Sequence, residues 1–283
     1  MRINFYKVFK DFLNCRKEMA LIEAAKWGNK NKLQQLLAQS VNPNVMDENG
    51  KTPLAWTAYS QNNINANLLL THGADPNCFA VGDANGTYTI LMQGAKNGNF
   101  SLVKDLIAHG VDLNKEQGIK SLFYAIDHGI YAPENSEYFE IAKALLSAGV
   151  NPNIGLVMAA QKDRIDYLDL LLTHGADPNI EDGLGRLALS VAAQYCHQKA
   201  CELLLKYGAD PTKKDKYGLD ALDYARSHSE IAEILTQDKS KLAEIYPNSP
   251  DPQKSLDNFF ERNNRLIAFL EQAVQDAQPQ PCC

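Results

Sequence analysis

The chain has 283 residues, with 28 Lys or Arg against 34 Asp or Glu, a formal net charge of −6 at pH 7. This acidic balance argues against a general nucleic-acid binder, and an apolar content of 45% is ordinary for a folded soluble protein. No run approaches the roughly 20 apolar residues of a membrane span, and the 6 cysteines show neither zinc-ligand spacing nor a disulfide framework, which suits a reducing compartment.

Residues 1–17 carry apolar side chains at helical spacing, among them Phe5, Phe9 and Phe12. Charges interrupt this stretch and no small-residue cleavage site follows, so it does not resemble a secretory signal. We expect an amphipathic helix that caps the structure after it. An interfacial membrane helix is the alternative, favoured by basic residues such as Lys7 and Lys10.

From residue 18 onward one five-residue phrase recurs. It reads Gly-Ala-Asp-Pro-Asn at Gly73–Asn77 and at Gly175–Asn179. Looser copies lie at Ser40–Asn44, Gly110–Asn114, Gly149–Asn153 and Gly208–Thr212. The ends of successive copies are 33, 37, 39, 26 and 33 residues apart, and 33 is the period of a unit made of a turn and two helices.

The third copy shows the expected pair of helices most clearly. Leu91 and Ala95 lie on one face of a first helix, and Leu102, Val103, Leu106 and Ile107 form the apolar stripe of a second. Asn97-Gly98 separates the two helices, and Gly110 is placed to end the second one. Such short helices must bury their apolar faces against neighbouring units.

Tight turns are predicted between the units, because Asn-Gly and Asp-Gly pairs supply the positive φ angles of hairpin turns. They lie at Asp47–Gly50, Asp83–Gly86, Asp182–Gly185 and Asp215–Gly218.

The segment Thr52–Ala58 resembles the ankyrin phrase Thr-Pro-Leu-His-x-Ala-Ala, with Asn49-Gly50 before it and His72–Asp75 after it. The resemblance covers about four-fifths of the chain and implies an all-α ankyrin-repeat solenoid of about seven repeats with β-hairpin fingers. The repeats are predicted at 18–44, 45–77, 78–114, 115–153, 154–179, 180–212 and 213–237.

Two adjacent repeats depart from this pattern. The fourth carries an insertion of 8 residues near Ile130–Glu137, and the fifth has lost its hairpin between Asn153 and Ile154. The insertion is either drift in a surface loop or a contact element, since loops on a rigid scaffold often carry binding.

After the repeats we expect a Pro-rich linker over 238–254 and an amphipathic helix over 255–277 with Ser255 as its N-cap. This helix either folds back on the last repeat or binds a partner. A flexible tail, 278–283, ends in Cys282 and Cys283. This ending resembles the doubly prenylated tails of small membrane-traffic GTPases, so both cysteines are candidates for lipidation, although they do not form a Cys-a-a-X box.

No catalytic motif is found: the chain has no Gly-rich phosphate loop, no HExxH and no GxSxG. His72, His109 and His174 precede closing glycines and are expected to bond the last carbonyls of second helices. His128 and His228 are expected between helices, without a matched nucleophile or carboxylate. We therefore predict no enzyme activity, no cofactor and no metal site.

The ankyrin resemblance implies that a partner protein docks on the concave face, made by hairpin tips and first helices. Aromatic residues there are candidate hot spots, although Trp56 and Phe123 could instead pack between neighbouring helices. Carried over by alignment, the partner-binding residues are Lys51, Trp56, Tyr59, Ser60, Lys96, Asn97, Phe123, Tyr124, Asp127, His128, Gln161, Lys162 and Tyr195. The same alignment places Met92 and Gln93 on this face.

The predicted function is a non-catalytic protein-binding scaffold or adaptor, monomeric and cytoplasmic, that does not bind nucleic acid. The divergent, Asn- and Gln-rich repeats also resemble ankyrin effectors that intracellular bacteria inject into host cells, which would place the chain in the host cytoplasm or on a host membrane. Two alternatives are a lipid-anchored adaptor modified at Cys282 and Cys283, and an enzyme or toxin that uses the repeats for substrate choice.

Overall fold

The structure, a computed structural model, describes residues 5–80, 88–113, 116–133, 136–227 and 251–277, except for the side chains of 5–12 and 252–253. The chain divides into two compact units, residues 1–151 and 152–283. The first unit contains α1 (Phe5–Lys26), α2 (Lys30–Ala38), α3 (Pro53–Tyr59), α4 (Asn63–Thr71), α5 (Ile90–Lys96), α6 (Phe100–Ala108), α7 (Glu116–Gly129) and α8 (Glu137–Ser147). The second contains α9 (Leu156–Gln161), α10 (Ile165–Thr173), α11 (Ala188–Gln194), α12 (Gln198–Lys206) and α15 (Pro252–Ala277), together with a helical segment at 221–227.

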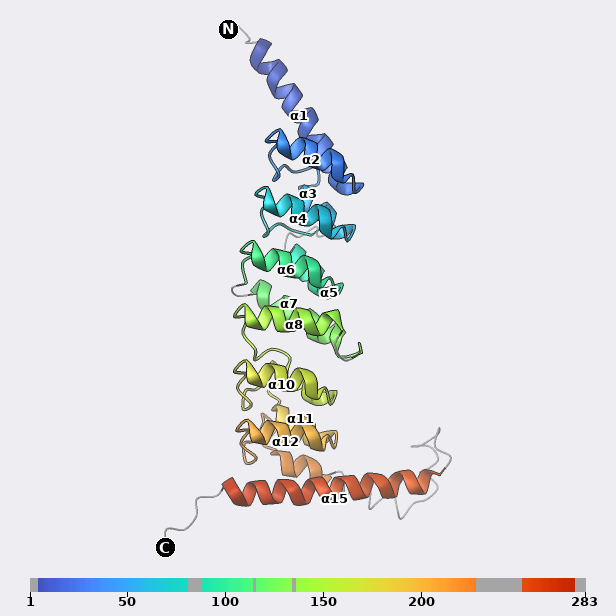
Figure 1. The fold of residues 1–283 in the computed structure, drawn as a ribbon. Helices are drawn as coiled ribbons and strands as arrows, with labels where there is room; N and C mark the ends of the chain where they lie inside the picture. Colours follow the sequence, from blue (N-terminus) through green and yellow to red (C-terminus); the bar gives the residue numbers. More distant parts are fainter. Residues whose placement is uncertain (1–4, 81–87, 114–115, 134–135, 228–250, 278–283) are drawn as a thin grey trace. The chain divides into compact units, whose positions relative to one another are not determined.

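The predicted all-α fold is confirmed. In the first unit the first helices α1, α3, α5 and α7 contact one another in succession, and so do the second helices α2, α4, α6 and α8 (Figure 1). In the second unit α9 contacts α11, and α10 contacts α12. The described ranges contain no strand, only two isolated antiparallel bridges, Phe79 with Thr89 and Glu181 with Leu187.

The core forms where the apolar pattern predicts it. Leu91, Ala95 and Leu106 are completely buried and Leu102 is almost so, whereas Ile107 is half-buried at the edge of the stripe. Helix starts also follow the sequence: Thr52 and Thr89 cap the first helices α3 and α5. Asn29, Asn62 and Asn99 cap the second helices α2, α4 and α6 by accepting a backbone N–H bond.

The closing glycines and the histidines before them behave as predicted. Gly110 has a φ of 76°, in the left-handed region that glycine enters without a Cβ clash. The Nδ1 atoms of His72, His109 and His174 lie 2.9, 2.8 and 2.8 Å from the carbonyl oxygens of Leu68, Asp105 and Leu170. These rings therefore bind the last turns of the second helices.

The recurring phrase links each repeat to the next through its final asparagine. The Asn44 side chain accepts a 2.7 Å bond from the Asp75 N–H and donates a 3.0 Å bond to the Gly73 carbonyl. Asn179 makes the same pair of bonds to Asp210 and Gly208, at 2.7 and 2.9 Å. All four bonding groups in each pair thus belong to consecutive copies of one phrase, which explains why the phrase recurs.

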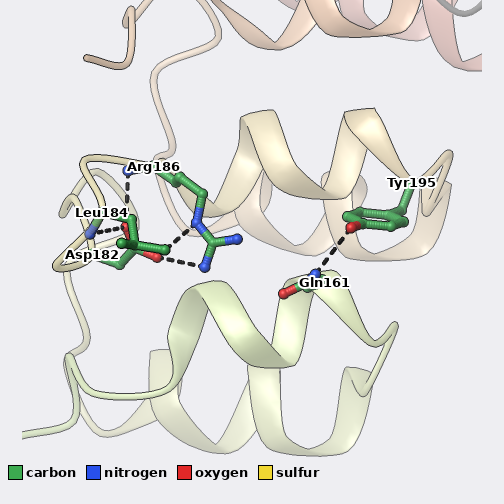
Figure 2. Close-up of polar contacts among 5 residues, drawn as sticks. All are labelled: Gln161, Asp182, Leu184, Arg186 and Tyr195. Carbon is green, nitrogen blue, oxygen red and sulfur yellow. Dashed lines mark hydrogen bonds and ion pairs between the residues drawn. The ribbon is translucent and has the colours of Figure 1, made fainter. Parts of the chain in front are cut away.

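Three predicted turns form around an aspartate. In Asp182, one carboxylate oxygen accepts the Leu184 and Arg186 N–H groups at 2.9 Å each, and the other accepts the Arg186 guanidinium at 2.9 and 2.7 Å (Figure 2). Asp47 and Asp215 hold equivalent turns. The turn predicted at Asp83–Gly86 lies outside the described residues.

The predicted end of the N-terminal helix at residue 17 is wrong. Residues 5–26 form the single helix α1, because no Gly or Pro interrupts the chain before Gly28. Its last part is the first helix of the first repeat, with Leu21 and Ala25 buried, whereas the side chains from Leu13 to Lys17 are exposed. The predicted apolar face at Phe5, Phe9 and Phe12 lies outside the described side chains.

The inserted residues of the fourth repeat extend both helices as well as the loop between them. α7 runs three residues past Ile126, whereas α5 ends one residue past the equivalent Ala95. α8 begins at Glu137, twelve residues before Gly149, whereas α6 begins ten before Gly110. His128 is therefore inside the last turn of α7, not between helices as predicted. His228 lies outside the described residues.

The C-terminal helix begins earlier than predicted, at Pro252, because Asp251 and not Ser255 accepts the cap bond from the Lys254 N–H at 3.0 Å. α15 packs on the last repeats of the second unit. Asn263, which has no exposed surface, donates to the Ala225 carbonyl at 3.0 Å and accepts from the Cys196 thiol at 3.4 Å. The packing of Leu266 and Leu270, both fully buried, favours the folded-back alternative over a free partner helix. Within the described ranges, no helix combines the length and apolar character needed to cross a membrane.

Candidate functional site

The end of α1 and the helix α3 bring two tryptophans, a tyrosine and a lysine together. Lys26 Nζ lies 4.5 Å from the Trp56 ring centroid and 5.5 Å from that of Trp27. Tyr59 meets Trp56 edge to face at 6.1 Å. Trp56 is half-buried, and its indole N–H donates a 2.9 Å bond to Asp47, so Trp56 ties the turn to the helix. Trp27, by contrast, is 77% exposed.

Asp47 is strongly engaged at this turn. Partial burial works to raise the pKa of its carboxyl, but bonds from Lys51, Trp56 and Asn49 and the nearby charge of Lys26 outweigh burial and lower that pKa. The carboxylate therefore stays charged and has several of its acceptor positions filled.

A second group of rings follows along α5 and α7. Tyr124 lies edge to face with Tyr88 at 5.9 Å, with Phe123 at 6.1 Å and with His128 at 6.4 Å. Lys96, the last residue of α5, holds its Nζ 6.0 Å from the Tyr88 ring and 5.9 Å from the Tyr124 ring. Burial, with the neighbouring Tyr124, raises the pKa of Tyr88 to about 12, so its hydroxyl remains a proton donor.

The insertion adds Tyr138 to this group. The Tyr138 ring lies 5.9 Å from that of His128, and its hydroxyl donates a 3.3 Å bond to the Lys96 carbonyl. A Cβ added to Gly98 would come within 3.0 Å of the Tyr138 ring, so a glycine is needed there for close packing as well as for its φ of 69°. The His128 Nδ1 lies 3.5 Å from an Asp127 oxygen but has no hydrogen-bond partner within the described ranges.

We call these residues of the first unit the cation–aromatic surface. It has two lysines, each over two rings, and its most exposed predicted aromatic residues are Tyr59 at 59% and Phe123 at 37%. Its members are Lys26, Trp27, Trp56, Tyr59, Tyr88, Lys96, Phe123, Tyr124, His128 and Tyr138.

Sequence reasoning missed Lys26, Trp27, Tyr88 and Tyr138 as members of this surface. Tyr88 directly precedes the helix cap Thr89, and Lys26 and Trp27 directly precede Gly28 at the end of a first helix. Lys26, Trp27 and Tyr88 could therefore have been predicted from their fixed positions in the repeat. Tyr138 belongs to the region of the insertion, which has no equivalent position in the other repeats.

The other residues predicted in the first unit end helices or close turns. Ser60 and Asn97 are exposed C-cap residues of α3 and α5, and Lys51 closes the Asp47 turn. Met92 and Gln93 are 2% and 9% exposed, so the expectation that they face a partner is wrong. Helix register alone did not distinguish these buried positions from the exposed face of α5.

The residues predicted in the second unit form a smaller group. Gln161 donates a 3.0 Å bond to the Tyr195 hydroxyl from the neighbouring repeat (Figure 2). The Tyr195 ring, 47% exposed, stacks on His197 with 5.9 Å between centroids. Lys162 is the exposed C-cap of α9.

The second unit also has an open cavity of about 380 Å³ between the turns of its repeats and α15. Its lining includes Cys196, His197 and Arg262. Burial raises the pKa of the Cys196 thiol despite the nearby Arg262, which is the opposite of what an activated nucleophile needs. In the described part of the chain, no three His, Cys, Asp or Glu side chains gather as metal ligands.

Known proteins share this sequence pattern and fold. A family model described as ankyrin repeats (3 copies) matches residues 3–80 and 156–248, and a single-repeat ankyrin model matches 86–115. Bovine mitochondrial disaggregase is 29% identical over 136 residues, which are 48% of this chain and 19% of that protein. A putative ankyrin repeat protein of Acanthamoeba polyphaga mimivirus is 26% identical over 166 residues, 55% of this chain and 20% of the viral protein. The chain thus spans about a fifth of these relatives.

Solved structures agree. The ankyrin repeat domain of human ASB11 matches with a TM-score of 0.54 and 26% identity, covering 72% of this chain and 90% of that domain. The ankyrin repeat domain of Bcl-3 matches with a TM-score of 0.58 at 19% identity, covering 72% and 92%, a likeness of fold alone. Because ankyrin models match more than half of its residues, the chain belongs to the ankyrin-repeat family.

Proposed function

We propose that this protein is a non-catalytic adaptor that binds a partner protein through the cation–aromatic surface of its first unit. Ankyrin repeats are a general protein–protein interaction module. The observation that supports this site is the gathering of aromatic rings along α1, α3, α5 and α7 with Trp27, Tyr59 and Phe123 left exposed. Aromatic side chains dominate interface hot spots because they bury a large area at little entropic cost.

We propose that this surface is part of the concave face predicted from the family resemblance, because first helices contribute to both. We propose that the protein acts as a monomer in the cytoplasm and does not bind nucleic acid. Transfer into a host cell as a bacterial effector, and lipidation at Cys282 and Cys283, stay predictions, and both cysteines lie outside the described residues. Intact mass of the protein from a eukaryotic cell tests the lipidation.

The test compares capture and affinity for one pair of variants. Proteins that the intact chain captures from cell extract are identified and the strongest is titrated by calorimetry. Tyr59→Ala with Phe123→Ala should weaken binding by about 2 kcal/mol or more if these rings are anchors. Tyr124 is a poorer choice than the sequence indicated, because it is half-buried among Tyr88, Phe123 and His128.

The matched control is Ile64→Ala, which removes a side chain of similar exposure, 63%, from the second helix α4. It should leave the affinity unchanged. Undiminished affinity of the Tyr59 and Phe123 pair, with melting temperature preserved, would refute the proposed site.

A further inference from the structure

We propose that the partner presents an extended acidic segment to the cation–aromatic surface, with carboxylates that meet Lys26 and Lys96. This inference rests on the proposed function and adds the chemistry of the partner. It comes from how charge is distributed on the surface.

The two lysines carry charge that the described residues leave without an ion pair. Lys26 and Lys96 are both exposed, and each is the last residue of a first helix. Each ammonium lies over two aromatic rings, and neither forms a salt bridge within the described ranges. Ring faces attract a cation but hold no formal charge, so a carboxylate can still pair with each ammonium.

The Asp47 carboxylate beside this surface already accepts several hydrogen bonds. Asp47 accepts the N–H groups of Asn49 and Lys51 and the indole N–H of Trp56. Asp127 lies 3.5 Å from the His128 Nδ1 without a hydrogen bond to it. Asp47 is therefore poorly suited to bind a basic partner, whereas the two exposed ammonium groups are suited to bind an acidic one.

The net charge of the chain does not oppose such a partner at this unit. Residues 1–151 contain 14 Lys or Arg and 14 Asp or Glu, so their formal charge is zero. Residues 152–283 contain 14 and 20, so the whole charge of −6 belongs to the second unit. An acidic segment is therefore expected to prefer the first unit.

The repeat spacing sets the spacing of the carboxylates. α1 contacts α3, and α3 contacts α5, so the two lysines are two helix-packing steps apart. Packed helices lie about 8–10 Å apart, which separates the lysines by roughly 16–20 Å. At about 3.3–3.6 Å per extended residue, the acidic residues should be about five or six positions apart. Between them, apolar or aromatic side chains would meet Trp56 and Tyr59.

The experiment selects ligands for the full chain from a displayed library of random peptides of about twelve residues, long enough to span both lysines. We expect enrichment of Asp and Glu at this spacing. The best acidic peptide, synthesised with a fluorescent label, is then titrated by anisotropy at low and high salt. Lys26→Glu with Lys96→Glu should weaken its binding about tenfold or more, because hydrogen bonds to charged groups are lost and like charges are introduced.

The matched control is Lys30→Glu with Lys104→Glu, which makes the same charge change at exposed lysines on the second helices α2 and α6. It should alter affinity by no more than about twofold. Circular dichroism shows whether each variant is folded.

Three results would overturn the inference. In the first, the selected peptides show no acidic bias, and their binding is unaffected by Lys26→Glu with Lys96→Glu but lost in Tyr59→Ala with Phe123→Ala. This result would support the proposed site and refute the acidic partner. No enrichment above a library panned without protein would remove the extended segment. A labelled single-stranded oligonucleotide that binds more tightly than the best peptide would replace a protein partner by a nucleic acid.

Discussion

Removing one asparagine bridge between repeats should measurably destabilise the protein. The Asn44 side chain makes two bonds to the next phrase, 2.7 Å from the Asp75 N–H and 3.0 Å to the Gly73 carbonyl. A net intramolecular hydrogen bond contributes about 0.5–1.5 kcal/mol, so Asn44→Ala should cost about 1–3 kcal/mol. The site is exposed and water can replace part of the loss, which favours the lower end.

Urea denaturation followed by circular dichroism measures this cost, with the midpoint shifted and the m-value unchanged. Asn179→Ala, at the equivalent bridge in the second unit, should cost a similar amount. The two changes share no partner, so their costs should add to within about 0.5 kcal/mol. Asn67→Ala is the control, at a half-buried position inside α4 and outside every copy of the recurring phrase. If Asn44→Ala costs no more than Asn67→Ala, the bridges do not stabilise the stack.

Three further predictions concern other parts of the molecule. Burial works to raise the pKa of Asp182, but bonds from Arg186 and Leu184 lower it; its contribution to stability is therefore present above the ordinary value of about 3.9 and lost as pH falls through the folded pKa. Denaturation midpoints of the wild type and Asp182→Asn should differ at pH 7 and converge in acid, and a constant gap would contradict this. Leu266→Ala in α15, at a fully buried position, should cost about 2–5 kcal/mol, and an unchanged midpoint would mean that α15 does not dock. Iodoacetamide should alkylate the exposed Cys15 well before the buried Cys196 and Cys201, whose thiol pKa values burial raises; peptide mapping that finds all three modified at one rate would refute the packing.

The repeat could be predicted because its signals are local. The phrase Gly73–Asn77 contains the helix-ending glycine and the asparagine that bonds to the next repeat. Earlier in the same repeat, Thr52 caps the helix α3. Such features need only the sequence spacing within one unit. The end of α1 was predicted too early, at residue 17, because the first repeat was expected to begin at residue 18. The absence of a helix breaker before Gly28 indicates the longer helix.

The surface could be predicted only in part, because its contacts depend on distance in space. Trp56 lay on the expected face, but its indole bond to Asp47 depends on how the turn folds over α3. Tyr88 and Tyr124 are in different repeats, and only the packing of α5 on α7 brings their rings to 5.9 Å. Asn263 interrupts the apolar stripe of α15, and its burial follows from partners at Cys196 and Ala225 that no helical pattern reveals.

The central claim is that a partner protein lies directly on the cation–aromatic surface, and site-specific photocrosslinking tests it most directly. A benzophenone amino acid replaces Tyr59, Phe123 or, as the control on the second-helix side, Ile64, each of which is exposed. After irradiation in cell extract, Tyr59 and Phe123 positions should give the same crosslinked protein, and the Ile64 position should give none. A partner that crosslinks from Ile64 but from neither of the other two positions would contradict the account.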